Sequence, residues 1–249
     1  MQKIEKWLCL FLVLVIFPPA AAQNFSLKLH YGYYYPSLGD VNSKIEEDIR
    51  GLRRDLQAPV PSPGEFNGSG VLGGQLEYRL NEDYFINLNV SYFQEKVELQ
   101  YRPSPAPSWR LEYLRELKSI DAIINLHFYF NYSTWKRFNK YLGIGVGLMF
   151  LQAESFTGSD NPDELLETRG KFSGNILSGV LAVGGHYRLS KPLLFWGEIG
   201  LQYGNFGELD GTVTTLENPN EVETVSNSSF DLTGLYARAG LGIGLPFIK

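Results

Sequence analysis

The chain has 249 residues, enough for one or two domains, and its 22 basic and 27 acidic residues leave a net charge of -5. That balance offers no positive footprint for nucleic acid. The mean hydropathy of -0.14 excludes a bundle of transmembrane helices. The 26 glycines and the 14% of aromatic residues exceed ordinary usage, but no collagen-like repeat accompanies them.

The first 22 residues predict a secretory signal peptide. Two lysines precede an apolar stretch at 7–17, and three alanines at 20–22 form a small-residue cleavage site. The apolar stretch is too short to span a bilayer as a helix, which takes about 20 residues. Cys9 lies inside this segment, so the mature domain, residues 23–249, contains no cysteine. An exported domain without disulfides must gain its stability from size or from closure of a barrel.

Eight segments of the mature chain alternate apolar and polar residues with a period of two, which predicts β-strands. In chain order they cover residues 25–35, 71–80, 84–101, 109–130, 140–151, 172–189, 193–205 and 230–247. The third and fourth segments exceed the roughly 9–11 residues that cross a bilayer. Their far halves are therefore expected to protrude as a hairpin.

Long and short connections alternate between these strands. The long ones are residues 36–67, 152–171 and 206–229, and the last two are acidic. Outer-membrane barrels distribute extracellular loops and periplasmic turns in this way. We therefore predict an all-β fold, an eight-stranded antiparallel up-and-down transmembrane β-barrel with short periplasmic turns and long extracellular loops.

A helix is predicted in the first long connection, from about residue 43 to 57. Ser43 and Glu46 have the spacing of a capping box. The helix would carry an apolar stripe of Ile45, Ile49, Leu52 and Leu56. We expect it to cap the barrel mouth, although the same stripe could lie on a membrane or dock a partner.

The polar faces of the strands decide which side is inside. They contain mostly Gly, Ser, Asn and Gln, whereas a soluble, lipocalin-like barrel would expose solvated Lys and Glu there. We therefore expect the apolar face to meet lipid, with the lipocalin-like arrangement as the alternative. The few charges on the inward face are expected to form one network of Lys28, Glu77, Arg79, Asp121, Arg188, Glu198 and Arg238. Eight strands leave an interior that side chains can fill, so a largely plugged lumen is predicted.

Alternating the strand directions gathers aromatic residues into two belts, as at the two surfaces of a bilayer. The expected periplasmic belt contains Tyr78, Tyr84, Phe128, Tyr187, Phe195 and Phe247. The expected outer belt contains Tyr33, Tyr35 and Tyr203.

The last strand carries Arg238, then Gly240 two residues on, and then the hydrophobic residues Ile243, Leu245 and Phe247 at alternate positions. This pattern resembles the C-terminal insertion signal of bacterial outer-membrane barrels, although Ile248 and Lys249 follow the aromatic residue. The mature chain as a whole resembles, in architecture, the small porin-like barrels of the OmpA, OmpX and OmpW kind. The resemblance implies a monomer in the outer membrane of a Gram-negative-type bacterium. It also implies contact with membrane lipid and lipopolysaccharide, and recognition by the barrel insertion machinery.

Three functions follow as hypotheses. The preferred one is a structural and interaction barrel whose protruding hairpin offers a strand edge to an extended peptide of an extracellular protein. The alternative is an OmpW-like channel for small hydrophobic compounds. The least favoured is a lipid A-modifying enzyme, which needs a histidine with serine or a carboxylate near the outer leaflet. His127 and His186 instead fall near the periplasmic ends of their strands and His30 near mid-barrel, so no catalytic residue is assigned.

The acidic connections also supply oxygen ligands that Ca²⁺ or Mg²⁺ could use: Asp160, Asp163, Glu164 and Glu167. Their spacing lacks the aspartate ladder and the glycine of a calcium-binding loop. A solvated acidic surface is expected, with no metal and no cofactor.

Overall fold

The structure is a computed structural model, which describes residues 25–103, 109–133, 136–161, 164–190, 192–215 and 223–244. These residues form one helix, α2 (Gly39–Asp55), and ten strands. The strands are β1 (Phe25–Pro36), β2 (Ser69–Arg79), β3 (Tyr84–Tyr101), β4 (Leu111–Tyr129), β5 (Phe138–Asn161), β6 (Glu164–Arg188), β7 (Leu193–Tyr203), β8 (Asn205–Thr215), β9 (Glu223–Asp231) and β10 (Gly234–Gly244). Within the described residues, no helix is long and apolar enough to cross a membrane.

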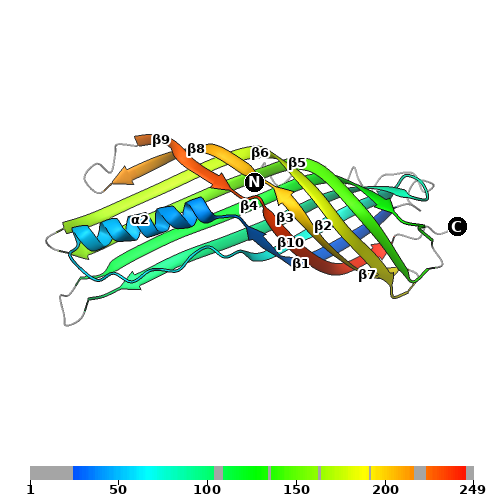
Figure 1. The fold of residues 1–249 in the computed structure, drawn as a ribbon, viewed down its shortest axis with the longest axis horizontal. Coiled ribbons are helices and arrows are strands. Elements are labelled where there is room, and N and C mark those ends of the chain that lie inside the picture. The colour runs from blue at the N-terminus through cyan, green and yellow to red at the C-terminus, as the bar shows by residue number, and fades with distance from the viewer. Residues whose placement is uncertain are drawn as a thin grey trace, which may run out of the picture.

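Eight strands close into an antiparallel barrel, seen from the side in Figure 1. The ring runs β1, β2, β3, β4, β5, β6, β7 and β10, and β10 pairs back with β1. The predicted eight-stranded fold is therefore confirmed. Closure gives every strand two neighbours, so no sheet edge remains within the ring.

The apolar faces of the barrel strands point outward. On β1, Leu29 and Tyr31 are 66% and 67% exposed, whereas the neighbouring Lys28 and His30 are buried. On β5, Ile144 is likewise exposed. A lipocalin-like barrel would bury these residues around a central cavity, so that alternative is wrong.

The outward apolar band has the height of a bilayer core. On β5 it runs from Phe138 to Phe150, and Gln152 is the next outward residue. Twelve steps of about 3.4 Å at a tilt of about 45° span roughly 29 Å, close to the 30 Å of hydrocarbon.

Four neighbouring strands continue past one end of the barrel, which we call the extended end. The strands β3, β4, β5 and β6 have 18, 19, 24 and 25 residues, whereas β1, β2, β7 and β10 have 11 or 12. Beyond the end of β7, β6 pairs with β8, and β8 pairs with β9. The opposite end, where short turns join the strands, is the short-turn end.

Two predicted loops are wrong. Residues 152–161 and 164–171 form the far ends of β5 and β6, and residues 206–229 contain most of β8 and most of β9. At the extended end the outward face is mainly polar, and small polar residues such as Ser155 and Thr157 lie on the inward face. The apolar alternation that marks a membrane strand is therefore missing, although the strand pairing continues.

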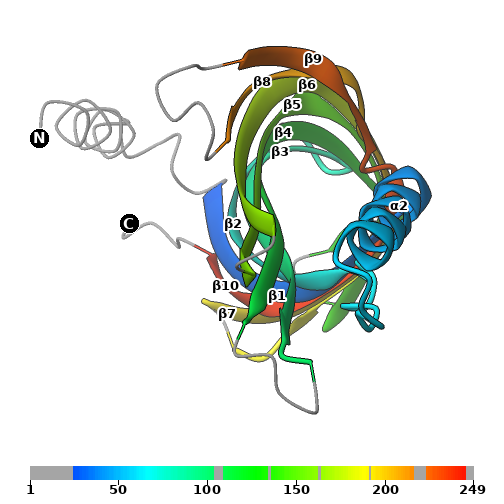
Figure 2. The same ribbon diagram turned by 90° about the vertical axis from the view of Figure 1, so that its left-hand side faces the viewer.

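The helix α2 occupies the open side of the arc formed by β3, β4, β5, β6, β8 and β9, as Figure 2 shows from the extended end. Val41, Ile45, Ile49 and Leu52 are its buried residues. They pack in one apolar cluster with inward residues of the sheet: Val97, Trp109, Leu111, Tyr113, Leu117, Met149, Leu151, Phe206 and Leu209. The helix therefore closes the open side of the extended sheet with its apolar face inward (Figure 2).

The predicted start of this helix is wrong. The helix begins at Gly39, its N-cap residue is Leu38, and no side chain bonds the first turn. Ser43 therefore lies inside the helix and does not cap it. Leu38 is itself buried in the apolar cluster, so packing of this residue, and not a capping box, fixes where the helix starts.

Candidate functional site

Two ion pairs lie inside the barrel. The ammonium group of Lys28 on β1 lies 2.8 Å from the carboxylate of Glu77 on β2, and the guanidinium group of Arg238 on β10 lies 2.5 Å from Glu198 on β7. Each carboxylate is buried. Buried charges are tolerated when they are paired and hydrogen-bonded, and here two cations balance two anions.

His127 on β4 joins the two pairs into one network. Its Nδ1 lies 3.1 Å from Glu77, and its Nε2 lies 3.9 Å from Glu198. The hydroxyl groups of Tyr141 and Tyr236 each donate to Glu198 at 2.7 Å. A charge in this interior is therefore held by several partners from different strands, and the side chains have little freedom to move apart.

Glycines on the neighbouring strands make room for the tyrosines. A Cβ atom on Gly184 would lie 2.6 Å from the hydroxyl oxygen of Tyr141, and one on Gly200 would lie 2.6 Å from that of Tyr236. These distances are shorter than an ordinary van der Waals contact. A larger residue at either glycine would therefore displace a tyrosine that donates a hydrogen bond to Glu198.

The structure brings four of the seven predicted network residues together and places three elsewhere. Asp121 lies farther toward the extended end, where Gln202 donates to it at 3.0 Å. Arg79 lies at the short-turn end with its guanidinium carbon 4.8 Å from the ring of Tyr132. Arg188 ends β6 at the same rim. Periodicity gives the face on which a charge lies but not its height relative to charges on other strands.

Sequence reasoning missed the roles of His127 and Trp196 in this network. Trp196 is fully buried, with its ring 5.5 Å from the ammonium group of Lys28 and 5.8 Å from the guanidinium carbon of Arg238. Both residues lie on predicted inward faces, and this position is the feature of the sequence that points to the network. Contact with both cations depends on how β7 pairs with β10.

The three histidines of the mature chain are buried inside the barrel. His127 contacts carboxylates, and His186 lies 3.3 Å from the Tyr129 hydroxyl. Both ring nitrogens of His30 are buried and have no hydrogen-bond partner. None of the three lies at the outward surface, where a lipid A headgroup would be reached.

The predicted aromatic belts occupy the two borders of the apolar band. At the short-turn end the rings of Tyr84 and Phe128 are 5.3 Å apart, and Tyr78 contacts Phe25 at 4.7 Å. Tyr187 and Phe195 are directly paired at the same border. At the other border Tyr33, Tyr35 and Tyr203 are exposed, as are Tyr92 and Phe150.

The predicted insertion signal is only partly described by the structure. Arg238, Gly240 and Ile243 lie on β10, with Ile243 exposed and Arg238 bound inside. Leu245 and Phe247, the latter also assigned to an aromatic belt, lie outside the described residues.

Polar contacts fix α2 to the sheet at the extended end. Asp48 of the helix accepts a hydrogen bond from Arg115 of β4 at 2.7 Å and one from the Tyr113 hydroxyl at 3.1 Å. The segment after the helix returns along it, where Asn42 and the backbone of Phe66 exchange two hydrogen bonds of 3.0 and 2.8 Å. Apolar packing and these bonds together make the extended end one packed unit.

One side of β3 has no strand partner at the extended end. Among the described residues, pairing between β2 and β3 stops at Phe93, whereas β4 continues to pair with β3 as far as Tyr101. Glu95 accepts hydrogen bonds from the backbone of Asn67 and Gly68, at 2.6 and 3.0 Å. Burial raises the pKa of Glu95, and these two donors oppose that shift. The edge of β3 without a strand partner therefore runs from about Gln94 to Tyr101.

Of the four candidate metal ligands, two contact other protein groups, and the side chains of the other two lie outside the described residues. Asp160 accepts a hydrogen bond from the backbone of Arg110, and Glu167 lies 2.9 Å from Arg169. Asp163 and the side chain of Glu164 lie outside the described residues. Within the described part of the chain, no group of three or more His, Cys, Asp or Glu residues could hold a metal ion.

No protein-family model and no curated protein matches the sequence. Among solved structures, the chain is similar to Neisserial surface protein A, with 12% identity, 88% of this chain and 96% of that chain covered, and a TM-score of 0.42. It is similar to the N-terminal β-barrel domain of Pseudomonas aeruginosa OprF, with 14% identity, 89% and 97% covered, and a TM-score of 0.38. It is also similar to a major outer membrane protein from Thermus thermophilus, with 12% identity, 88% and 98% covered, and a TM-score of 0.47. By its own closed ring of eight strands and its outward apolar band, the chain has the fold of a small outer-membrane β-barrel.

Proposed function

We propose that the signal peptide exports this protein to the outer membrane of a Gram-negative-type bacterium. The apolar band then faces lipid, the short turns face the periplasm, and the extended end lies outside the cell. The height of the band supports its place in a bilayer. The short turns at one end and the long strands at the other support this orientation. Insertion would follow recognition of the last strand by the barrel insertion machinery.

We propose further that the barrel does not conduct solutes. The interior holds the Glu77 and Glu198 network, then a buried apolar group that includes Tyr34, Phe93 and Tyr236, and then the apolar cluster around α2. Side chains therefore fill successive levels of an eight-stranded lumen, the size at which they are able to do so. Refolded protein in a planar bilayer is expected to show no unit conductance, and steady single-channel steps would overturn this part of the proposal.

Within this barrel the extended end serves as a docking platform for an extracellular protein. The observation that carries the proposal is the unpaired edge of β3 from Gln94 to Tyr101, on a sheet that packs against α2. An extended peptide can add to such an edge through main-chain hydrogen bonds. Lys96 and Glu98 on the edge strand pair with each other at 2.6 Å and discourage unselective pairing.

Peptides selected from a displayed library against the refolded protein test this edge. The mature chain has no cysteine, so a nitroxide can be placed singly on Gln100→Cys at the edge or on Gln152→Cys, on the outward face of the inner strand β5. A bound peptide should immobilise the label at 100 and leave that at 152 unchanged. Failure to select any binder, or equal immobilisation of both labels, would contradict strand addition.

The two other functions receive less support. An OmpW-like passage for hydrophobic compounds needs open space in the upper barrel, where Ile45, Ile49 and Leu52 of α2 pack against the sheet. A lipid A-modifying enzyme needs a base at the outer leaflet, and the histidines lie inside the barrel. Unaltered lipid A in expressing cells, measured by mass spectrometry, is the result expected for a barrel without this activity.

A further inference from the structure

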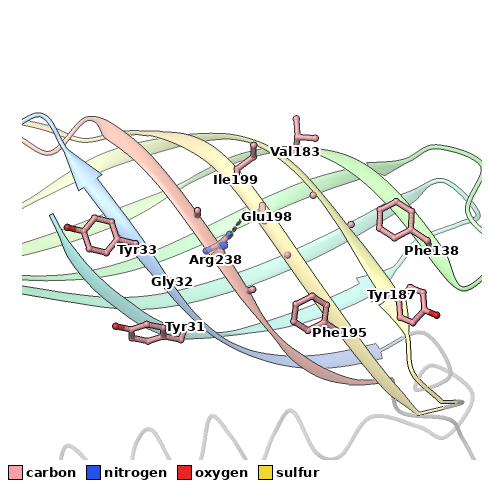
Figure 3. A pocket seen from close by; sticks show the side chains of 15 residues that line it. Tyr31, Gly32, Tyr33, Phe138, Val183, Tyr187, Phe195, Glu198, Ile199 and Arg238 are labelled. Atoms are coloured by element: carbon pink, nitrogen blue, oxygen red, sulfur yellow. Dashed lines mark hydrogen bonds and ion pairs between the residues drawn. The ribbon is translucent and has the colours of Figure 1, made fainter.

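A groove of about 840 Å³ lies on the outward surface of the barrel, within the apolar band. We call it the lipid-facing trough. Figure 3 shows Phe138, Tyr187 and Phe195 toward its short-turn end, and Tyr31 and Tyr33 toward the other. The side chains of Glu198 and Arg238 turn away from it into the barrel, where they are buried.

The floor of the trough is a row of small residues on adjacent strands. Gly185 of β6 pairs with Gly197 of β7, which pairs with Ala239 of β10. Outward neighbours two residues along the strands are large, with Phe195 on one side and Ile199 on the other. Because outward side chains alternate along each strand, a row of small residues between two rows of large ones leaves a depression.

The length of the trough is close to the thickness of one leaflet, and the trough runs across that leaflet. It extends from β5 to β1, four strand spacings of about 4.8 Å, or about 19 Å. One leaflet contributes roughly 15 Å of the 30 Å hydrocarbon core. Since the strands are tilted, the row of paired residues rises from the short-turn border toward mid-barrel, as an acyl chain does.

A cation lies at the short-turn end of the same row. Lys140 of β5 pairs with Gly185, so its side chain is the next outward group in line with the floor. It is exposed, and its ammonium group lies 6.0 Å from the ring of Phe130 at the short-turn border. A lysine at this depth extends its charge to the interface, where lipid phosphate groups lie.

We propose that the lipid-facing trough binds one phospholipid of the periplasmic leaflet, with an acyl chain on the Gly185, Gly197 and Ala239 floor and the phosphate at Lys140. The charge of Lys140 favours an anionic headgroup. An acyl chain in the groove binds more tightly than lipid elsewhere on the barrel, because the walls of the groove contact it on both sides. The site is independent of the docking platform at the extended end. It rests on the proposed orientation of the barrel, with the short turns toward the periplasm.

Native mass spectrometry of the refolded full chain, titrated with phosphatidylglycerol or phosphatidylethanolamine, tests the proposal. Wild-type protein should retain one lipid, with phosphatidylglycerol favoured by about fivefold, the scale of one lysine at a membrane surface. Gly197→Leu fills the trough and should reduce retention of both lipids by at least about tenfold, as expected for added methylenes in an apolar pocket. Lys140→Gln should remove the headgroup preference and leave the retention of phosphatidylethanolamine unchanged.

Gly74→Leu is the matched control, because Gly74 is an outward glycine on β2 outside the trough. A Cβ on Gly197 or Gly74 meets its nearest neighbour at 3.7 or 3.5 Å, so both variants should fold. The control should retain lipid like the wild type. Equal retention by Gly197→Leu and Gly74→Leu would overturn the proposal. So would a wild-type dimer that Gly197→Leu abolishes, because the trough would then be an interface between two copies.

Discussion

The carboxylate of Glu198 lies 2.5 Å from the guanidinium group of Arg238, and the two residues occupy directly paired positions on β7 and β10 inside the barrel. The strand pairing itself therefore brings the two charges together. Both charges are buried, so removal of either partner should lower the free energy of unfolding by a large amount.

We predict that Glu198→Gln lowers the free energy of unfolding by about 3–5 kcal/mol, because it leaves the Arg238 charge buried and uncompensated. Urea unfolding of the refolded barrel in lipid vesicles measures the change. The double variant Glu198→Gln with Arg238→Met should recover part of the loss, since it removes the stranded charge. A double variant less stable than Glu198→Gln would argue against the pairing.

Gly184→Ala is predicted to destabilise the barrel by about 1–3 kcal/mol, the usual range for overpacking an interior. Its Cβ would lie 2.6 Å from Tyr141 and 2.8 Å from the backbone oxygen of Gly197. Gly179→Ala on the same strand is the control, because nothing lies within 4 Å of its Cβ position. Similar unfolding midpoints for the two variants would mean that the Tyr141 ring does not occupy this site.

A charge in the outward band should be costly only where lipid is present. Ile144→Arg, on an exposed position near the middle of the band on β5, should cost about 2–4 kcal/mol in vesicles. Gln152→Arg on the same face of the same strand should have little effect, because that position lies beyond the band. Equal costs at both positions would contradict the proposed membrane boundary.

The extended end should lose its structure separately from the barrel. Ile45 is buried at 2% exposure in the cluster between α2 and the sheet, so Ile45→Ala should destabilise that cluster by about 2–5 kcal/mol. Native-state proteolysis should then cleave the extended end faster, while resistance of the barrel to heat in detergent stays the same. Glu47→Ala, an exposed change on the same helix, should leave the cleavage rate unaltered.

The alternation of residues along the chain is enough to predict much of the fold. The period of two predicts Leu29 outward and Lys28 inward, and the same rule predicts the barrel, its polar interior and the aromatic residues at both borders. This works because in a strand the side of the sheet follows directly from residue parity. The apolar stripe of α2 likewise indicated correctly that this helix needs a surface to bury it.

Other features depended on which strands meet and in what register. Parity put Asp121 and Glu198 on the same inward face, but the pairing of β7 with β10 chose Arg238 for Glu198, and Gln202 contacts Asp121. The acidic segments predicted to be loops are strands, because β6 pairs with β8 beyond the end of β7. Local sequence specifies the face of a strand, whereas partner, register and height come from closure of the whole sheet, since a hydrogen-bonded ladder forms only when both edges are present.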